Sequence, residues 1–216
     1  MWDDGDKNGY LKLTKNNIGQ INDGVLKNTI EKLCNDNTNL TFLEIGTWNG
    51  LGSTKLFVDG LSKRTDSWNF YSLEANIDKS NDARKLYDGL ENVHILNEVI
   101  THDYSNIHDV FPELITNSTY KYWNYVDDEN LKNCNVFLER TDLPKMFDVV
   151  FLDGGEFTTY NEFQILKHRS KYILLDDVKT CKCNKIAQEI RNYKDIWQII
   201  LDLPNERNGI MLAKKL

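Results

Sequence analysis

The chain has 216 residues, and its 26 lysines and arginines against 33 aspartates and glutamates give a formal net charge of −7. This acidic balance argues against a nucleic-acid partner and against affinity for anionic lipid. No apolar run approaches the roughly 20 residues of a membrane helix, and the acidic start is unlike a signal peptide. We therefore expect a folded protein without membrane insertion.

The four cysteines are too few for a disulfide framework, and none has the spacing of a zinc site. The close pair, Cys181 and Cys183, is interpreted as two reduced thiols in a loop. A redox or metal site at this pair is the alternative. The cysteine content favours a reducing, cytoplasmic location.

Short apolar runs alternate with longer segments of helical character, beginning with a helix predicted over Ile18–Leu33. Because strand–helix–strand repetition gives parallel pairing through right-handed crossovers, the pattern predicts a doubly wound, mostly parallel seven-stranded α/β sheet. The predicted strands are Thr41–Ile45, Phe70–Leu73, Val93–Leu96, Phe147–Leu152, Tyr172–Leu175, Trp197–Leu201 and Gly209–Ala213. The helices predicted between them are Ser53–Ser62, Lys79–Asp88, Asn161–His168 and Ile186–Tyr193.

The last two strands are separated only by residues 204–208, which is too short for a crossover helix, so they should form an antiparallel hairpin at one edge. About 40 residues, 102–145, replace the usual helix and short loop; such a segment is typically a functional lid or a disordered insertion. We expect one domain over residues 1–216, with this lid-like insertion. We also hypothesise that this domain comes from a longer multidomain protein.

A glycine-rich loop follows the first strand, with the spacing Gly-x-x-x-Gly-x-Gly over Gly46, Gly50 and Gly52. This differs from the Gly-x-Gly-x-x-Gly of pyrophosphate-binding dehydrogenases. Glycine would let a cofactor approach the backbone closely. Glu44, just before the loop, would repel a pyrophosphate and attract an ammonium group.

An acid, Glu74, ends the second strand 22 residues after Gly52, where it could accept both hydroxyls of a ribose. Taken alone, the loop could be an ordinary strand-to-helix turn and Glu74 a helix cap. Taken together, they predict a site for a nucleoside-type cofactor.

These residues resemble the Glu-x-Gly-x-x-x-Gly loop and the strand-ending acid of the class I S-adenosylmethionine-dependent methyltransferases. The resemblance implies a Rossmann-like sheet that ends in an antiparallel hairpin strand. It also implies that the loop residues bind the amino acid part of the cofactor, that Glu74 binds the ribose, and that the residues after the second and third strands border the adenine. The implied cofactor-binding residues are Glu44, Gly46, Thr47, Gly50, Glu74, Ala75, Asn76 and Asn97.

Three aspartates follow the fourth and fifth strands: Asp153, Asp176 and Asp177. Because the carboxyl ends of parallel strands meet at one edge, these side chains should lie beside the cofactor loop. Carboxylates without histidine or cysteine favour Mg²⁺, Mn²⁺ or Ca²⁺ over zinc. The alternative is that they only order their loops.

The three aspartates match the metal positions of the metal-dependent O-methyltransferases, both the catechol type and the type that methylates macrolide sugars. In those families a lysine or a histidine three residues after the first metal acid is the general base; here Glu156 stands at that position, beside the catalytic metal acid Asp153. Glu156 could accept a proton or act as a fourth carboxylate around the ion.

The resemblance implies methyl transfer to a hydroxyl that a divalent ion, Mg²⁺ or Mn²⁺, activates. Similar domains with an Asp-Gly-Gly-Glu-Phe run occur in glycan-assembly proteins, sometimes fused to glycosyltransferases, so a sugar such as rhamnose is the expected acceptor. The alternatives are a catechol-type small molecule, a non-catalytic binding module and a nicotinamide dehydrogenase. Aromatic residues of the insertion could stack on the acceptor or anchor the insertion to a core of its own: Tyr120, Tyr122, Trp123 and Tyr125.

Overall fold

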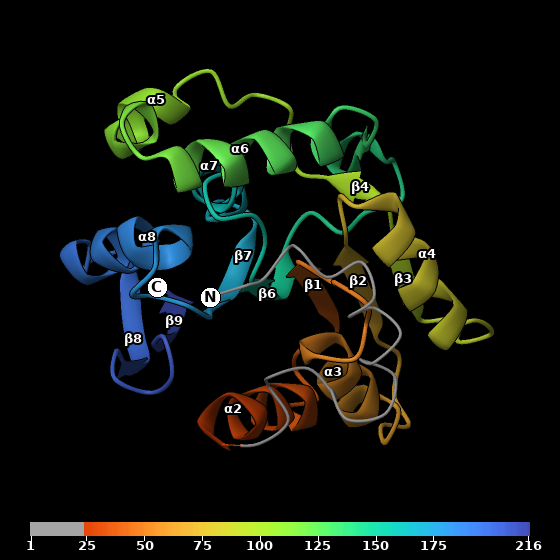
Figure 1. Cartoon of the computed structure of the whole chain (residues 1–216). Helices are drawn as coiled ribbons and strands as arrows, with labels where there is room; N and C mark the ends of the chain where they lie inside the picture. Colours follow the sequence, from red (N-terminus) through yellow and green to blue (C-terminus); the bar gives the residue numbers. More distant parts are fainter. Residues whose placement is uncertain (1–23) are drawn as a thin grey trace.

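A computed structural model describes residues 24–216 and contains the predicted seven-stranded sheet, in the order β3-β2-β1-β6-β7-β9-β8 (Figure 1). The strands are β1 Thr41–Ile45, β2 Asn69–Leu73, β3 Val93–Leu96, β6 Phe147–Leu152, β7 Ser170–Leu175, β8 Trp197–Leu203 and β9 Ile210–Lys215. The strands from β3 to β7 pair in parallel, whereas β9 is antiparallel to both β7 and β8. The mostly parallel sheet and its edge hairpin are thereby confirmed.

The strand order reverses between β1 and β6, because the chain runs outward from β1 to β3 and then returns to the other side of β1. In open α/β sheets, ligands bind outside the carboxyl ends of the strands at such a switch point. The glycine loop after β1 and the loop after β6 both start at this point. The topology therefore places the predicted cofactor and metal residues next to each other.

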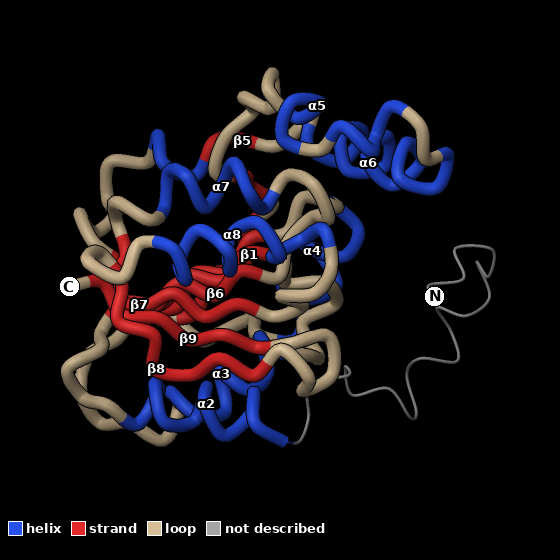
Figure 2. The backbone as a smooth tube through the Cα atoms, turned by 90° about the vertical axis from the view of Figure 1, so that its left-hand side faces the viewer, coloured by secondary structure: helices blue, strands red, loops and turns tan. Residues whose placement is uncertain are grey.

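Helices cover both faces of the sheet (Figure 2). On one face lie α2 (Gly24–Asn35) and α3 (Ser53–Leu61), and on the other α7 (Thr159–Leu166) and α8 (Cys181–Asn192); α4 (Ile77–Leu86) packs beside β3. Strand β6 is nearly all apolar because alternate residues face opposite layers. Val149 and Phe151 pack with α2 and α3, whereas Val150 and Leu152 pack with α7 and α8.

Three of the predicted helices begin earlier in the structure: α4 and α7 by two residues and α8 by five. The leading helix is confirmed over Gly24–Leu33, and residues 18–23 of the prediction lie outside the described residues. The placement of Cys181 and Cys183 in a loop was wrong, because both lie in the first turn of α8, where Cys183 is buried against the sheet. The first five residues of α8 are mostly polar, and Cys183 is the one among them that faces the core. The apolar spacing typical of a helix is therefore absent from the sequence at the start of α8. All four cysteines are unpaired.

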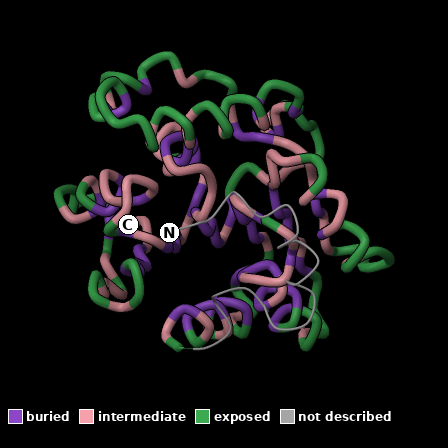
Figure 3. Tube along the Cα trace, viewed as in Figure 1, coloured by how far each residue is buried: buried purple, intermediate pink, exposed green. Residues whose placement is uncertain are grey.

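The segment 102–145 is largely helical rather than disordered. It contains α5 (Ile107–Val110), the 3-10 turns η1 (Pro112–Ile115) and η2 (Phe137–Glu139), and the longer helix α6 (Ser118–Leu131). Its base is closed by a two-stranded parallel sheet, β4 (Glu98–Val99) with β5 (Asn135–Val136). Helix α6 lies across the carboxyl edge of the main sheet (Figure 1), and much of its outer surface is exposed (Figure 3).

Between residues 24 and 216, no helix has both the length and the apolar character that crossing a membrane requires.

Phe151 is fully buried in the central strand β6. Its ring packs against the ring of Phe57, and the two ring centroids are 5.9 Å apart. We expect Phe151→Ala to lower the free energy of unfolding by about 3–5 kcal/mol, because it leaves a cavity in a close-packed layer. Urea denaturation followed by circular dichroism measures the change. Ile200→Ala, at a half-exposed position of β8, is the control and should change it by less than about 0.5 kcal/mol. Equal effects of the two substitutions would contradict the packing described.

Candidate functional site

The glycine loop between β1 and α3 is packed against the loop that follows β6. Gly46 has a φ of +100°, and a Cβ there would collide with the backbone carbonyl of Asp153. The Gly46 amide donates a hydrogen bond to the Leu73 carbonyl (2.9 Å), and the Asp153 amide donates to the Ile45 carbonyl (2.9 Å). The three loops after β1, β2 and β6 are thus held together directly by their backbones.

Gly50 is constrained from the opposite side. Its φ is +78°, and a Cβ would lie 3.0 Å from both Ala83 Cβ and Tyr87 Cε2. The Tyr87 hydroxyl also donates a hydrogen bond to the Gly50 carbonyl. Contacts within the protein therefore require both glycines. The sequence alone predicted glycine there only because a cofactor would lie close to the backbone.

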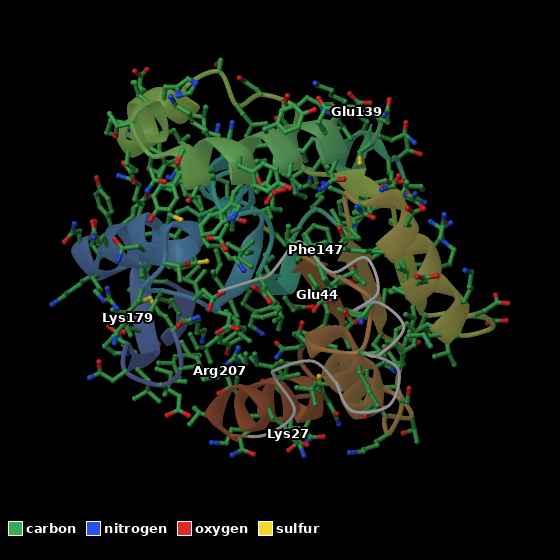
Figure 4. The ribbon with its side chains drawn as sticks, viewed as in Figure 1. Lys27, Glu44, Glu139, Phe147, Lys179 and Arg207 are labelled. Atoms are coloured by element: carbon green, nitrogen blue, oxygen red, sulfur yellow. The ribbon has the colours of Figure 1, made fainter. Side chains whose placement is uncertain are left out.

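Glu44 lies fully buried beneath the loop, in the middle of the sheet (Figure 4). Its carboxylate accepts hydrogen bonds from Ser53 Oγ (2.5 Å), Thr54 Oγ1 (2.6 Å) and Ser72 Oγ (2.5 Å). Burial raises the pKa of Glu44 to about 7, although the three hydroxyls oppose this shift. Glu44 thus fixes the start of α3 to β2, and its direct contact with a cofactor stays a prediction.

Thr47 belongs to the same buried network. Its side chain is buried, and its hydroxyl lies 2.6 Å from the Ser72 hydroxyl, which in turn donates to Glu44. Its backbone amide donates to the Leu73 carbonyl (3.2 Å). Thr47 therefore fixes the loop backbone from below.

Glu74 lies at the carboxyl end of β2, as predicted, and its carboxylate braces the loops on either side. One oxygen accepts the Trp48 amide (2.7 Å) and the other the Asn76 amide (2.8 Å). Burial is the main cause of a raised pKa at Glu74. Each carboxylate oxygen has two lone pairs, so one acceptor position on each oxygen is left for a ligand such as a ribose diol.

Asn97 follows β3 and holds the backbone next to Glu74. Its side-chain amide donates to the carbonyl of Glu74 (2.8 Å) and to that of Ala75 (2.9 Å). Ala75 also packs against Cys134 near the end of the insertion, whose thiol is 3.4 Å from the Ala75 carbonyl. The structure thus brings together the predicted residues after β2 and β3, and the insertion completes their surroundings.

The three predicted metal acids come together at the ends of β6 and β7. One carboxylate oxygen from each of Asp153, Asp176 and Asp177 lies within 4.8 Å of the others. Asp176 is only 1% exposed, and burial together with its two acidic neighbours raises its pKa to about 7. Two buried oxygens, Asp176 Oδ1 and Asp177 Oδ1, accept no hydrogen bond from residues 24–216.

Two cations face these acids, and neither was predicted from the sequence. The Lys182 ammonium is 2.7 Å from Asp153 Oδ1 and 3.1 Å from Asp177 Oδ2, and Arg207 Nη2 is 3.3 Å from Asp176 Oδ2. Although burial alone would lower the pKa of Lys182, the two aspartates raise it well above its usual value. Lys182 therefore stays charged.

Glu156 lies outside the cluster formed by the three aspartates among the described residues. Its Oε2 accepts a hydrogen bond from the Cys181 thiol (3.3 Å), whose pKa is raised to about 12 by burial and then by Glu156. The role of Glu156 as general base stays a prediction.

The insertion contributes an acid of its own, Asp127 of α6. A Cβ on Gly155 would lie 2.7 Å from Asp127 Oδ2, so the side chain rests directly on the loop that carries Asp153 and Glu156. Asp127 Oδ2 is buried and has no hydrogen-bond partner in the described part of the chain. Burial, and then Glu156, raises the pKa of Asp127 to about 7.

Phe157 attaches the insertion to the loop after β6 that carries Asp153 and Glu156, which we call the acidic loop. Its ring is fully buried and lies 5.3 Å from the Phe111 ring and 5.4 Å from the Tyr120 ring, measured between centroids. Tyr120 stacks on Trp123 at 5.5 Å, so these two aromatic residues anchor the insertion to its own core. Tyr122 and Tyr125 are 51% and 59% exposed, and neither belongs to this core.

Glu162 of α7 lies behind the acidic loop, is 3% exposed, and has a pKa raised to about 8 by burial and then by Asp127. Because a raised pKa keeps the proton in the folded state, its contribution to stability is full at low pH and lost as the pH rises towards 8. We expect the free energy of unfolding to fall between pH 5 and pH 8, and Glu162→Gln to reduce this fall by on the order of 2 kcal/mol. Urea denaturation at several pH values measures it.

The matched control is Glu113→Gln, at an exposed position of η1, which should keep the wild-type pH dependence. A Glu162→Gln protein with the same pH slope as the wild type would show that Glu162 is ionised in the folded state.

No family model matches the chain, and no curated protein does. Solved structures do match over nearly its whole length. A methyltransferase from Geobacter sulfurreducens has a TM-score of 0.59 at 11% identity, covering 100% of this chain and 92% of that chain. The O-methyltransferase of Bacillus cereus in complex with SAH has a TM-score of 0.58 at 14% identity, covering 96% and 90%.

A Staphylococcus aureus protein assigned as a caffeoyl-CoA O-methyltransferase matches with a TM-score of 0.58 at 16% identity, covering 97% of this chain and 90% of that one. At these identities the similarity establishes the fold. The chain has the Rossmann-like fold of the class I S-adenosylmethionine-dependent methyltransferases.

Proposed function

We propose that the protein is an S-adenosylmethionine-dependent O-methyltransferase that is assisted by a divalent cation. The observation that carries this proposal is the contact of Gly46 with the Asp153 backbone, which puts Glu74 and the three aspartates on either side of one glycine loop. A nucleoside site and a hard-cation site thus share one edge of the sheet. The similarity to an O-methyltransferase in complex with SAH supports the same activity.

The cofactor would lie along the glycine loop, with the ribose hydroxyls on the two oxygens of Glu74. The fit rests on the arrangement of Glu74, whose backbone donors hold both oxygens and leave acceptor positions on each. Ala75 and the amide of Asn97 would border the adenine. The loop from Gly46 to Gly50, including Thr47, would hold the amino acid part.

The three aspartates suit a hard divalent ion such as Mg²⁺ or Mn²⁺, because they offer only carboxylate oxygens. The unpartnered oxygens of Asp176 and Asp177 support this fit, since buried polar atoms normally have a partner. When bound, such an ion lowers the pKa of a coordinated hydroxyl and orients its oxygen.

The chain's own residues supply orientation and proton transfer. Helix α6 lies across the carboxyl edge, and its Asp127 rests on Gly155, next to Glu156. Glu156 is the proposed acceptor of the hydroxyl proton. Asp127, which the buried environment keeps partly protonated, would hydrogen-bond a second polar group of the acceptor.

An acceptor with vicinal hydroxyls suits this site, because one hydroxyl could bind an ion while the other is held by Asp127 or Glu156. Both a sugar diol and a catechol have this feature. The sugar acceptor stays a prediction from the sequence, and a small catechol-type compound is the second candidate. The similarity to a protein assigned as a caffeoyl-CoA O-methyltransferase favours testing both classes.

We expect SAH to bind one-to-one, and Glu74→Gln to weaken its binding by about tenfold or more, because a hydrogen bond to a charged group contributes about 1.5–3 kcal/mol. Isothermal titration calorimetry measures both affinities. The control is Glu91→Gln, at an exposed position just before β3, which should leave the affinity unchanged. Absence of SAH binding to the wild-type protein would refute the proposed activity and favour a binding module without catalysis.

We expect Asp153→Asn to lower methyl transfer on the order of 100-fold while changing the SAH affinity by less than about tenfold. The measurement is transfer of a labelled methyl group to panels of catechols and deoxysugars, with Mg²⁺ or Mn²⁺ present. Asp195→Asn, at an exposed turn before β8, should retain full activity. Unchanged turnover in the Asp153→Asn variant would rule out the metal-assisted mechanism.

A further inference from the structure

Lys182 places its ammonium within the acidic cluster, at hydrogen-bond distance from two of the aspartates. Its ammonium contacts Asp153 Oδ1 and Asp177 Oδ2, and thus binds two of the three proposed metal ligands at once. Its side chain is only 11% exposed, and those of the two aspartates are 18% and 16% exposed. These pairs are therefore well shielded from solvent, and screening by water or salt weakens them little.

The third aspartate is paired differently. Asp176 contacts Arg207, which the turn between β8 and β9 brings to the ends of β6 and β7. Lys182 and Arg207 together supply two positive charges to three carboxylates. Within the cluster, the buried oxygens without a hydrogen-bond partner among the described residues are Asp176 Oδ1 and Asp177 Oδ1, both on the aspartates that follow β7.

We propose that Lys182 is an internal cation that pairs with Asp153 and Asp177 when no metal is bound, and that a divalent ion must displace its ammonium to use all three aspartates as ligands. This inference rests on the metal site of the proposed function. It goes further in making Lys182 a competitor of the metal. The ion then binds less tightly than three buried carboxylates alone would allow.

The surroundings of Lys182 provide a place for the displaced ammonium. Lys182 starts from the first turn of α8, and its long side chain reaches Asp153 across the edge of the sheet. Asp127 rests on Gly155, two residues after Asp153 in the same loop, and Glu156 follows Gly155 directly. A lysine displaced from Asp153 would therefore still have carboxylates beside it, facing the proposed acceptor.

The first experiment titrates the metal-free full-length protein with Mn²⁺ by calorimetry. Lys182→Met should bind Mn²⁺ more tightly than the wild type by about tenfold or more, which corresponds to about 1.4 kcal/mol. The matched control is Lys179→Met. Lys179, labelled in Figure 4, is exposed, lies three residues earlier in the loop before α8, and donates a hydrogen bond to Asn205 Oδ1. Its Mn²⁺ affinity should stay within about twofold of the wild type.

The second experiment uses the wild-type protein, so it does not depend on the folding of a variant. Amine acetylation, quantified by peptide mass spectrometry, should label Lys182 weakly without metal and several-fold more in saturating Mn²⁺. Lys179 serves as the internal reference. Equal labelling of Lys182 in both conditions would refute displacement, as would a folded Lys182→Met protein that binds Mn²⁺ no more tightly than the wild type.

SAH titration of the same preparations separates this inference from the proposed function. Normal SAH binding with no effect of Lys182→Met on Mn²⁺ affinity would overturn the role of Lys182 alone. Normal SAH binding with no Mn²⁺ binding in either protein would overturn both the metal assistance and the displacement. Loss of SAH binding in the wild type would overturn the proposed activity itself.

Discussion

Negative charge concentrated at one edge of the sheet is the constraint on which the rest of the site depends. Eight acids gather there: Glu44, Glu74, Asp127, Asp153, Glu156, Glu162, Asp176 and Asp177. Folding has to stabilise each of them, because an isolated buried carboxylate is costly. The protein uses a different means for each group.

Three hydroxyls satisfy Glu44, and two backbone amides brace Glu74. Lys182 pairs with Asp153 and Asp177, and Arg207 pairs with Asp176, so that two positive charges offset part of the charge of the three aspartates. Glu162 instead has its pKa raised far enough to hold its proton near neutral pH. The buried carboxylates are thus stabilised in three different ways: by hydrogen bonds, by ion pairs and by retention of the proton.

The sheet could be predicted closely from the sequence because each strand is a short apolar run whose ends are marked by polar or turn residues. The site residues at the strand ends followed from the same pattern, since parallel strands share one carboxyl edge. Lys182 could not be predicted, because the start of α8 has no apolar period. Arg207 could not be predicted either, because only the register of the hairpin brings it to Asp176. Asp127 depends on how α6 crosses the edge, which no local pattern encodes.

The two glycines illustrate a different limit of sequence reasoning. Their positions pointed to the correct loop, but the contacts that require them are with Asp153, Ala83 and Tyr87. A glycine therefore marks a close approach without revealing what approaches it. Here the approaching groups belong to the protein, and the loop is shaped before any cofactor arrives.

The burial of Phe157 between Phe111 and Tyr120 has a consequence for how this protein could diversify. The segment that covers the site shares its hydrophobic core with the loop that carries the acids, so the two are not independent modules. Exchange of residues 102–145 for the corresponding segment of a distant homologue would leave this aromatic side chain without matching partners. In the proposed methyltransferase, new acceptor preferences would therefore arise more easily through changes on α6, such as at Asp127, than through replacement of the whole segment.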